Sequence, residues 1–338
     1  MTQKLRWGIL GTGNIARQFA EGVRQSARGE LAAVGSRSGE SARAFAEQFN
    51  IPASHSSYAA LLADSSYDAL YISLPNTMHH EWTMEALQAG KHVLCEKPIS
   101  VTADEAREMF AAALRSGRVL IEAFMYRAHP QTLRAVELVR SGAIGQLKSI
   151  RTSFCYRVRK IEGNIRFDAT LAGGALMDVG CYCVSFSRLL AGAEPVRLHA
   201  ASIRHPSGVD EQTSGLLEFP GGVSAIFNVG MMTQADNTAY ICGDEGYLKI
   251  SIPWKPPAGG GEVVQLQSTP PRQDNPNVLP KVPEPVIHRI AEERNVYAVE
   301  ADAFAACVLD SAEPFVSEAD TVGNMVALDA LRSKIASQ

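Results

Sequence analysis

The chain has 338 residues, of which 46% are hydrophobic and 20% are charged, a composition typical of a globular protein long enough for two domains. Its 32 basic and 36 acidic residues leave a formal net charge of −4, too small to favour a nucleic-acid partner. No apolar run approaches the ~18 residues of a membrane span and the first residues lack a targeting pattern, so we expect a cytoplasmic protein without a membrane partner.

From residue 5 to about 125, short apolar runs alternate with helical patterns. The runs are typical of fully buried strands and lie at 6–10, 30–35, 68–74, 91–95 and 118–123. The helical patterns lie at 14–25, 40–49, 79–89 and 103–115. This alternation predicts βαβ units in a doubly wound parallel sheet, that is, an α/β Rossmann domain over residues 1–125.

The segment 11–16, between the first strand and the first helix, has the pattern G-x-G-x-x-A. The first glycine suits a tight turn, and the second lets the backbone approach a pyrophosphate on the helix N-terminus. A plain structural turn is the alternative, but the order strand, loop, helix is the one that dinucleotide binding requires. The residues predicted to contact the cofactor here are Gly11, Thr12, Gly13, Asn14 and Ile15.

The second predicted strand ends in the segment GSRS at 35–38. Enzymes selective for NAD usually carry an acidic residue here for the ribose 2′-hydroxyl. Ser36 and Arg37 instead supply a hydroxyl and a guanidinium suited to a 2′-phosphate. A solvated turn with a surface arginine is the alternative. We predict that both residues bind the cofactor and that NADP is preferred over NAD.

Two further strand ends carry polar residues at the edge of the sheet where ligands bind in open α/β folds. After the third run, we expect Leu74, Pro75, Asn76 and His79 to contact the cofactor, although His79 fits equally well as a helix-terminal residue without a chemical role. After the fourth run come Glu96, Lys97 and Pro98. Pro98 lacks an N–H and favours an extended Lys97, which directs the lysine side chain. On their own, these three residues fit a salt bridge that caps a strand equally well.

Beyond residue 125 the pattern changes to that of an α+β domain. Helices are expected at 131–140, 175–190, 295–309 and 318–336, and strands at 147–158, within 196–251 and at 263–267 inside a proline-rich stretch, 253–285. These elements predict a second domain over 126–338 with a large, open, mostly antiparallel sheet. The six cysteines lie apart in apolar surroundings, which favours reduced core residues, and no metal site is predicted.

In the predicted helix 175–190, Asp178 and Tyr182 lie four residues apart and therefore on one face. Gly180 between them costs ~1 kcal/mol relative to alanine in a helix interior, which is tolerable where another backbone or a ligand comes close. A packed tyrosine beside a solvent-facing aspartate is the alternative.

Several segments together resemble the glucose–fructose oxidoreductase/inositol dehydrogenase (Gfo/Idh/MocA) family over nearly the whole chain. They are GILGTGNIA (8–16), GSRS (35–38), LPNTMHH (74–80), CEKPIS (95–100), EAFMYRAHPQ (122–131) and GGALMDVGCY (173–182). The resemblance implies an NAD(P)-dependent oxidoreductase, most similar to the NADP-linked sugar branch that includes D-xylose, glucose–fructose and dimeric dihydrodiol enzymes. It also implies a homodimer or homotetramer formed through the open sheet of the second domain.

The resemblance further implies that Lys97 and Tyr182 are catalytic, with Tyr182 as the acid/base and Asp178 binding a second substrate hydroxyl. A free tyrosine titrates near pH ~10, and we expect the Lys97 ammonium to lower the pKa of Tyr182. Lys97 would also position substrate and cofactor, and Glu96 would orient Lys97 or contact the cofactor. Further candidates for the substrate pocket are Tyr126, Arg127, His129, Asn164 and Arg166.

The sequence thus predicts hydride transfer between NADP and a secondary alcohol or carbonyl of a sugar or related polyol. Reduction of a sugar carbonyl or oxidation of a dihydrodiol is the alternative among enzymes. A non-catalytic NADP sensor or scaffold could use the same fold, but such a protein would not need the acid/base set Lys97, Asp178 and Tyr182.

Overall fold

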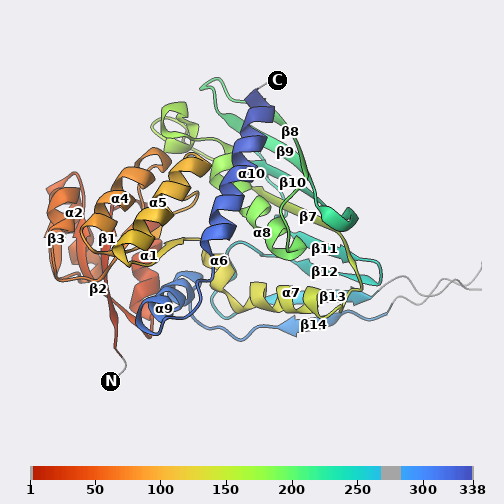
Figure 1. Ribbon diagram of the computed structural model, residues 1–338, viewed down its shortest axis with the longest axis horizontal. Helices are drawn as coiled ribbons and strands as arrows, with labels where there is room; N and C mark the ends of the chain where they lie inside the picture. Colours follow the sequence, from red (N-terminus) through yellow and green to blue (C-terminus); the bar gives the residue numbers. More distant parts are fainter. Residues whose placement is uncertain (1–2, 268–282, 337–338) are drawn as a thin grey trace, which may run out of the picture.

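The computed structural model describes residues 3–267 and 283–336. It contains two sheets, each covered by helices, with helix α10 (Glu318–Ala336) between them (Figure 1). The proline-rich connection predicted at 253–285 lies partly outside the described residues, at 268–282.

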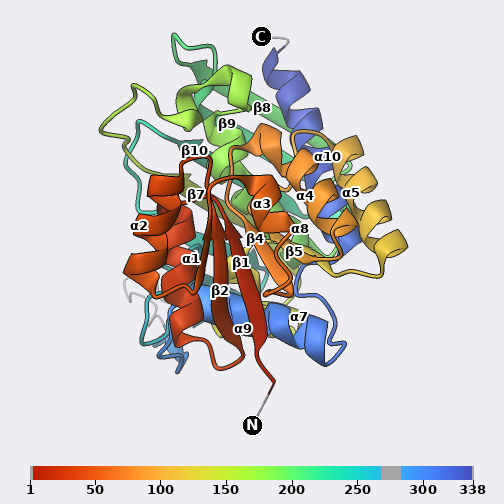
Figure 2. The same cartoon turned by 90° about the vertical axis from the view of Figure 1, so that its left-hand side faces the viewer.

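The first sheet has six parallel strands in the order β3-β2-β1-β4-β5-β6, which is the order of a Rossmann fold. The strands are β1 (Leu5–Leu10), β2 (Gly29–Gly35), β3 (Ala53–His55), β4 (Ala69–Ile72), β5 (His92–Cys95) and β6 (Leu120–Glu122). The helices between them are α1 (Asn14–Gln25), α2 (Gly39–Phe49), α3 (Tyr58–Leu62), α4 (His79–Gln88) and α5 (Ala103–Ser116). Figure 2 shows α1 and α2 on one side of the strands and α4 and α5 on the other, so the predicted doubly wound sheet is confirmed.

The second sheet has eight strands in the order β14-β13-β12-β11-β7-β10-β9-β8, antiparallel except for the pair β7 and β10. The strands are β7 (Leu147–Cys155), β8 (Arg197–Arg204), β9 (Asp210–Glu218), β10 (Ser224–Gly230), β11 (Ala239–Gly243), β12 (Gly246–Ile250), β13 (Glu262–Gln267) and β14 (Val286–Arg289). The remaining helices are α6 (Met125–Ala128), α7 (Pro130–Arg140), α8 (Cys181–Ala191) and α9 (Val296–Leu309). The predicted mostly antiparallel sheet is therefore confirmed, and β3, α3 and β14 are additions too short to give a clear periodicity.

Helix α9 returns from the second half of the chain to pack on the first sheet. The Phe304 ring lies 5.0 Å from that of Trp7 on β1, and a methyl group on Gly22 of α1 would lie 2.5 Å from the Cβ of Tyr297. The division of the chain at residue 125 stays a prediction, and helix α9 shows that residues from beyond it complete the cover of the first domain.

The helix predicted over 175–190 consists of a π-helix, Leu176–Gly180, followed directly by α8. A π-helix has i→i+5 hydrogen bonds and is found frequently at functional sites, so Asp178 and Tyr182 do not keep simple α-helical spacing. The close approach at Gly180 comes from side chains rather than from another backbone or a ligand, because a methyl group there would lie 2.8 Å from the Leu176 side chain.

The helical segment Ala169–Ala191 is long and apolar enough to cross a membrane, which differs from the expectation that no such run exists. However, 67% of its most apolar window is buried within the protein. Helix α8 contacts β7 and α10, so this segment is packed as a core helix.

The loop that follows β5 and carries Lys97 is held from behind by Glu122, at the end of β6. The Glu122 side chain is fully buried, and its Oε1 accepts a hydrogen bond from the Ile99 N–H at 3.0 Å. Burial in apolar surroundings raises the pKa of Glu122 to about 8. The loop is thus tied to the neighbouring strand by a carboxyl group that is protonated at neutral pH.

We predict that Glu122→Gln makes stability less dependent on pH. Between the ordinary pKa of 4.5 and the raised value of about 8, the unfolded wild type binds fewer protons than the folded protein. Its stability therefore falls as pH rises through this window, by at most about 1.4 kcal/mol per pH unit. The glutamine keeps an acceptor for Ile99 without titrating. Urea unfolding should show the variant gaining stability over the wild type between pH 5 and pH 8.

The exposed Glu47 of α2 provides the matched control, as Glu47→Gln. A stability difference between Glu122→Gln and the wild type that is the same at pH 5 and pH 8 would show that Glu122 does not titrate in this window.

Candidate active site

A cavity of about 540 Å³ opens at the carboxyl ends of the strands of the first sheet, where they face the second domain. The first domain contributes the glycine-rich loop after β1 and the loops after β4 and β5. The second domain contributes β7, the π-helix, the start of α8, and side chains from two distant segments, Lys255 and Tyr297. The site therefore lies between the domains.

The glycine-rich loop has the backbone that dinucleotide binding requires. Gly11 has a φ of +103°, which disfavours any residue with a side chain. A methyl group on Gly13 would meet nothing within 4 Å, so the space over the helix N-terminus is open. No side chain caps α1, which leaves its first N–H groups able to bind a phosphate. Asn14 and Ile15 line the cavity, and Thr12 lies in the same loop. These residues fit the pyrophosphate of a nicotinamide dinucleotide.

The end of β2 stands directly beside this loop, because the Gly11 N–H donates to the Gly35 carbonyl at 2.9 Å. Ser36 is buried and Arg37 is exposed, and Arg37 interacts with the hydroxyl of Tyr58 on α3. A hydroxyl and a guanidinium are thus placed where the adenosine ribose of a dinucleotide would lie.

The loop after β4 links the two domains. Leu74 and Asn76 line the cavity, with Pro75 between them, and the Asn76 Nδ2 donates to the Ala172 carbonyl of the second domain at 2.9 Å. Asn76 therefore fixes the distance between the cofactor side of the cavity and the second domain.

His79 lines the cavity, but its ring nitrogens have partners within the protein, so its contact with the cofactor stays a prediction. Its side chain is fully buried, with Nδ1 2.9 Å from the Pro98 carbonyl and Nε2 2.8 Å from the Leu74 carbonyl. Because both ring nitrogens face backbone carbonyls, neither is available to a ligand. His79 instead joins the loop after β4 to the loop after β5.

Lys97 brings the three predicted catalytic residues together. Its Nζ donates to the Asp178 carbonyl at 2.7 Å, lies 3.4 Å from the Asp178 Oδ1 and lies 5.0 Å from the centre of the Tyr182 ring. Burial opposes the charged form, but the neighbouring Asp178 and Glu96 still raise the pKa of Lys97 above its ordinary value. The lysine is therefore a positively charged group at neutral pH.

Asp178 is the centre of the polar contacts in the cavity. Its Oδ2 accepts hydrogen bonds from the Tyr156 hydroxyl and from Arg166 Nε, the latter at 2.9 Å. Burial alone would raise its pKa, but Lys97, Arg166 and Tyr156 hold the pKa of Asp178 well below its ordinary value. Asp178 is therefore an ionised acceptor facing the cavity.

Tyr182 lies among aromatic side chains, and its pKa is raised there, whereas the sequence led us to expect a lowered pKa. Its side chain is only 4% exposed, its hydroxyl lies 3.4 Å from the Met125 Sδ, and the Phe154 ring lies 5.3 Å away. Burial raises the pKa of Tyr182 well above 10, and the nearby Glu96 and Asp178 raise it further. In the protein on its own, Tyr182 is a neutral phenol and hence a proton donor.

Glu96 supports Lys97 from the protein interior. Its Oε1 accepts a hydrogen bond from the Tyr71 hydroxyl, and its Oε2 accepts one from the Lys97 backbone N–H at 3.2 Å. Burial raises the pKa of Glu96. The carboxyl group therefore holds the backbone that carries the lysine, and its orienting role stays a prediction.

Three residues predicted for the substrate pocket lie behind its wall instead. The Tyr126 hydroxyl donates to Ser185 Oγ at 2.8 Å, and the buried Arg127 pairs with Asp320 of α10. His129 caps α7 by accepting from a backbone N–H. None of the three lines the cavity, because the chain turns into the core after β6 and these side chains join helices to one another. Their role in the substrate pocket stays a prediction.

Asn164 does not line the cavity, and its place in the substrate pocket stays a prediction. Its Oδ1 accepts from the Arg166 N–H at 3.1 Å, so it shapes the turn, while Arg166 itself lines the cavity. Residues that the sequence did not indicate include Phe154, near the end of β7, and Tyr156, the first residue after that strand. Lys255 and Tyr297 had no local signal.

All six cysteines are unpaired. Within residues 3–267 and 283–336, no group of three or more His, Cys, Asp or Glu side chains is arranged to hold a metal ion.

Known proteins share both the fold and much of the sequence. Two of them are D-xylose 1-dehydrogenase (NADP(+)) 2 of Haloferax volcanii, 35% identical over 97% of this chain and 96% of the relative, and the mouse trans-1,2-dihydrobenzene-1,2-diol dehydrogenase, 37% identical over 75% and 76%. The crystal structure of a 3-ketoreductase from Actinomadura kijaniata, in complex with NADP and TDP-benzene, superposes with a TM-score of 0.86 at 30% identity, covering 98% of both chains.

Two family descriptions match consecutive parts of the chain. Residues 5–124 match the oxidoreductase family with an NAD-binding Rossmann fold, and residues 132–249 match the GFO/IDH/MocA C-terminal domain. Together with the relatives above, these matches confirm the resemblance stated from the sequence motifs. The chain is an oxidoreductase that belongs to the Gfo/Idh/MocA family.

Proposed function

We propose that the protein transfers a hydride between NADP and a secondary alcohol or carbonyl carbon of a sugar or related polyol. The observation that carries this proposal is the position of Lys97, which touches Asp178 and the Tyr182 ring within the same cavity that the glycine-rich loop lines. A site for the cofactor and a proton donor thus open on one space, as hydride transfer requires.

The cofactor, when bound, would donate or accept the hydride. In the direction of reduction, the Tyr182 hydroxyl would give its proton to the carbonyl oxygen of the substrate, and the Lys97 ammonium would stabilise the negative charge left on the tyrosine. In the direction of oxidation, the same oxygen would take the proton of the alcohol. The raised pKa of Tyr182 supports the role of proton donor.

Asp178 would position the substrate for this transfer. As an ionised acceptor it can bind a hydroxyl next to the reacting carbon, and sugars and polyols carry such neighbouring hydroxyls. Arg166 and Tyr156 would keep its carboxylate oriented, since both donate to Oδ2. Charge-assisted hydrogen bonds of this kind add geometric specificity.

One observation favours oxidation of a dihydrodiol as a second candidate. Phe154 lines the cavity and stacks on Trp254 with ring centroids 5.7 Å apart, which offers a flat apolar wall for a cyclic diol. Absorbance of the reduced nicotinamide with D-xylose, polyols and a trans-dihydrodiol would distinguish these substrates. No turnover with any of them would favour a sensor or scaffold.

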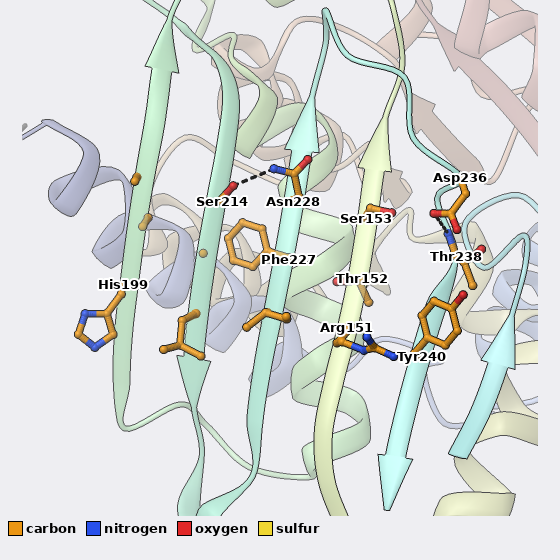
Figure 3. Close-up of a pocket in the computed structure, with 15 residues that line it drawn as sticks. Arg151, Thr152, Ser153, His199, Ser214, Phe227, Asn228, Asp236, Thr238 and Tyr240 are labelled. Carbon is orange, nitrogen blue, oxygen red and sulfur yellow. Dashed lines mark hydrogen bonds between the residues drawn. The ribbon is translucent and has the colours of Figure 1, made fainter. Parts of the chain in front are cut away.

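We also propose that the open face of the second sheet joins two copies of the chain, as a homodimer or within a homotetramer. Helices α7, α8 and α10 contact the sheet, whereas a shallow hollow of about 650 Å³ lies over strands β8, β9, β10 and β7 (Figure 3). Ile226 is 46% exposed there and is paired in register with Leu216 and Arg151. A second copy would cover this apolar centre.

A cytoplasmic location is proposed from the unpaired cysteines.

We predict that Tyr182→Phe and Lys97→Met each lower turnover by roughly 10²-fold or more while NADPH binding is largely kept. The first removes the proton that is transferred, and the second removes the charge that stabilises the reacting oxygens. Steady-state rates and a fluorescence titration with NADPH would measure the two effects. The matched controls are Tyr247→Phe and Lys249→Met on β12, outside the cavity. Near-normal rates in both active-site variants, Tyr182→Phe and Lys97→Met, would refute the mechanism.

We predict that Arg37→Ala reduces or reverses the preference for NADP over NAD. Loss of the guanidinium should weaken binding of the 2′-phosphate by about 10-fold or more, the loss expected for one charge-assisted hydrogen bond, and leave NAD binding nearly unchanged. Parallel titrations with NADPH and NADH would show this. If the wild type binds NADH more tightly, or if the variant keeps the wild-type ratio, the assignment of Arg37 is wrong.

We predict that Ile226→Asp dissociates the oligomer into single chains, because it places a charge at the centre of the proposed interface. Sedimentation velocity across a range of concentrations would measure the mass. Leu114→Asp, at a residue of α5 that is 82% exposed, should keep the wild-type mass. A monomeric wild type, or an unchanged mass for Ile226→Asp, would show that this face is not the interface.

A further inference from the structure

Lys255 reaches from the second domain across the mouth of the cavity to the first domain. It follows β12 in the chain, and its Nζ donates to the Gln18 Oε1 on α1 at 2.9 Å. The same ammonium lies 5.6 Å from the centre of the Tyr297 ring on α9. Three segments that are far apart in the sequence thus meet at one positive charge.

This charge differs from the two other cations that line the cavity. Lys97 and Arg166 each form an ion pair with Asp178. Among the residues that the structure describes, Lys255 forms no ion pair: its hydrogen bond is to a neutral amide. Lys255 is exposed to solvent, so its ammonium is accessible to an incoming anion. A cation held in this way is prepared for an anion that the protein itself does not supply.

The neighbours of Lys255 indicate which anion this is. Gln18 lies one turn after Asn14 on the same face of α1. Both residues line the cavity together with Lys255 and Gly13. The N–H groups at this end of α1 have no side-chain cap and face the same space. Among the described residues, no hydrogen bond or ion pair joins Lys255 to the substrate-binding groups proposed above, Asp178 on the π-helix and Tyr182 on α8.

We propose that Lys255 binds the pyrophosphate of the nicotinamide cofactor from the second domain. The phosphates would then be held from two sides, by the helix N-terminus of the first domain and by an ammonium of the second. The lysine would exchange its bond to Gln18 for one to a phosphate oxygen, so the cofactor would replace α1 as its partner in the first domain. This inference rests on the proposed function and adds a binding residue outside the glycine-rich loop.

Titrations that do not depend on turnover test this proposal. Lys255→Met should weaken NADPH binding by roughly 10-fold or more at low salt, the loss expected for one charge-assisted hydrogen bond, and the difference should shrink as salt is added. Lys255→Arg, which keeps the charge, should stay within about 2-fold of the wild type. Binding of 2′-AMP, which has no pyrophosphate, should be the same in all three proteins.

Lys249→Met on β12 is the matched control and should bind NADPH as the wild type does. If Lys255→Met binds NADPH normally but has a raised KM for the substrate, the lysine recognises a substrate anion and the proposal is overturned. Equal weakening of NADPH and 2′-AMP would also overturn it, since a general loss of fold would explain the result. A wild type that binds neither ligand would refute the proposed function itself.

Discussion

The contact between Lys97 and Asp178 is the interaction on which the rest of the site depends. It joins a loop of the first sheet to the π-helix of the second domain, with the Lys97 Nζ 2.7 Å from the Asp178 carbonyl. Both partners are largely withdrawn from water, so each would be costly without the other. Three buried groups hold the loop from behind: Glu96 accepts from the Lys97 N–H, Glu122 accepts from the Ile99 N–H, and His79 lies against the Pro98 carbonyl. The lysine is therefore aimed by the core of the first domain at a carboxylate of the second.

This pairing also sets which residues of the site carry a charge and which keep a proton. Asp178 is kept ionised by its cationic and hydroxyl neighbours, and Lys97 is kept charged by the carboxylates. Tyr182, a few ångströms away, is surrounded by aromatic rings and keeps its proton because burial raises its pKa. A neutral donor beside a fixed cation and a fixed anion is an arrangement suited to transferring one proton to or from an oxygen atom.

The placement of the cavity follows from the topology of the two sheets. Strands β1, β4 and β5 are neighbours in the first sheet, so the loops after them meet at one edge although they are up to 90 residues apart in sequence. The second sheet uses its two faces differently. One packs against helices that include α8, which carries Tyr182, and the other is open to solvent over Ile226. The proposed catalytic residue and the proposed interface thus lie on opposite sides of the same sheet.

The sequence by itself determined the features that depend on local pattern: the βαβ alternation, the glycine-rich loop, the strand ends at Asn76 and Lys97, and the family motifs that linked Lys97 to Asp178 and Tyr182. Tertiary structure alone decided what each polar side chain faces. Arg127 and His129 look like ligand-binding residues in the sequence, but their side chains have partners within the protein. Both ring nitrogens of His79 face backbone carbonyls. Lys255 and Tyr297 enter the cavity from distant segments without any local signal. Burial and partners set the pKa of Tyr182 and the role of each charge, and neither can be obtained from a pattern because both depend on residues far apart in the chain.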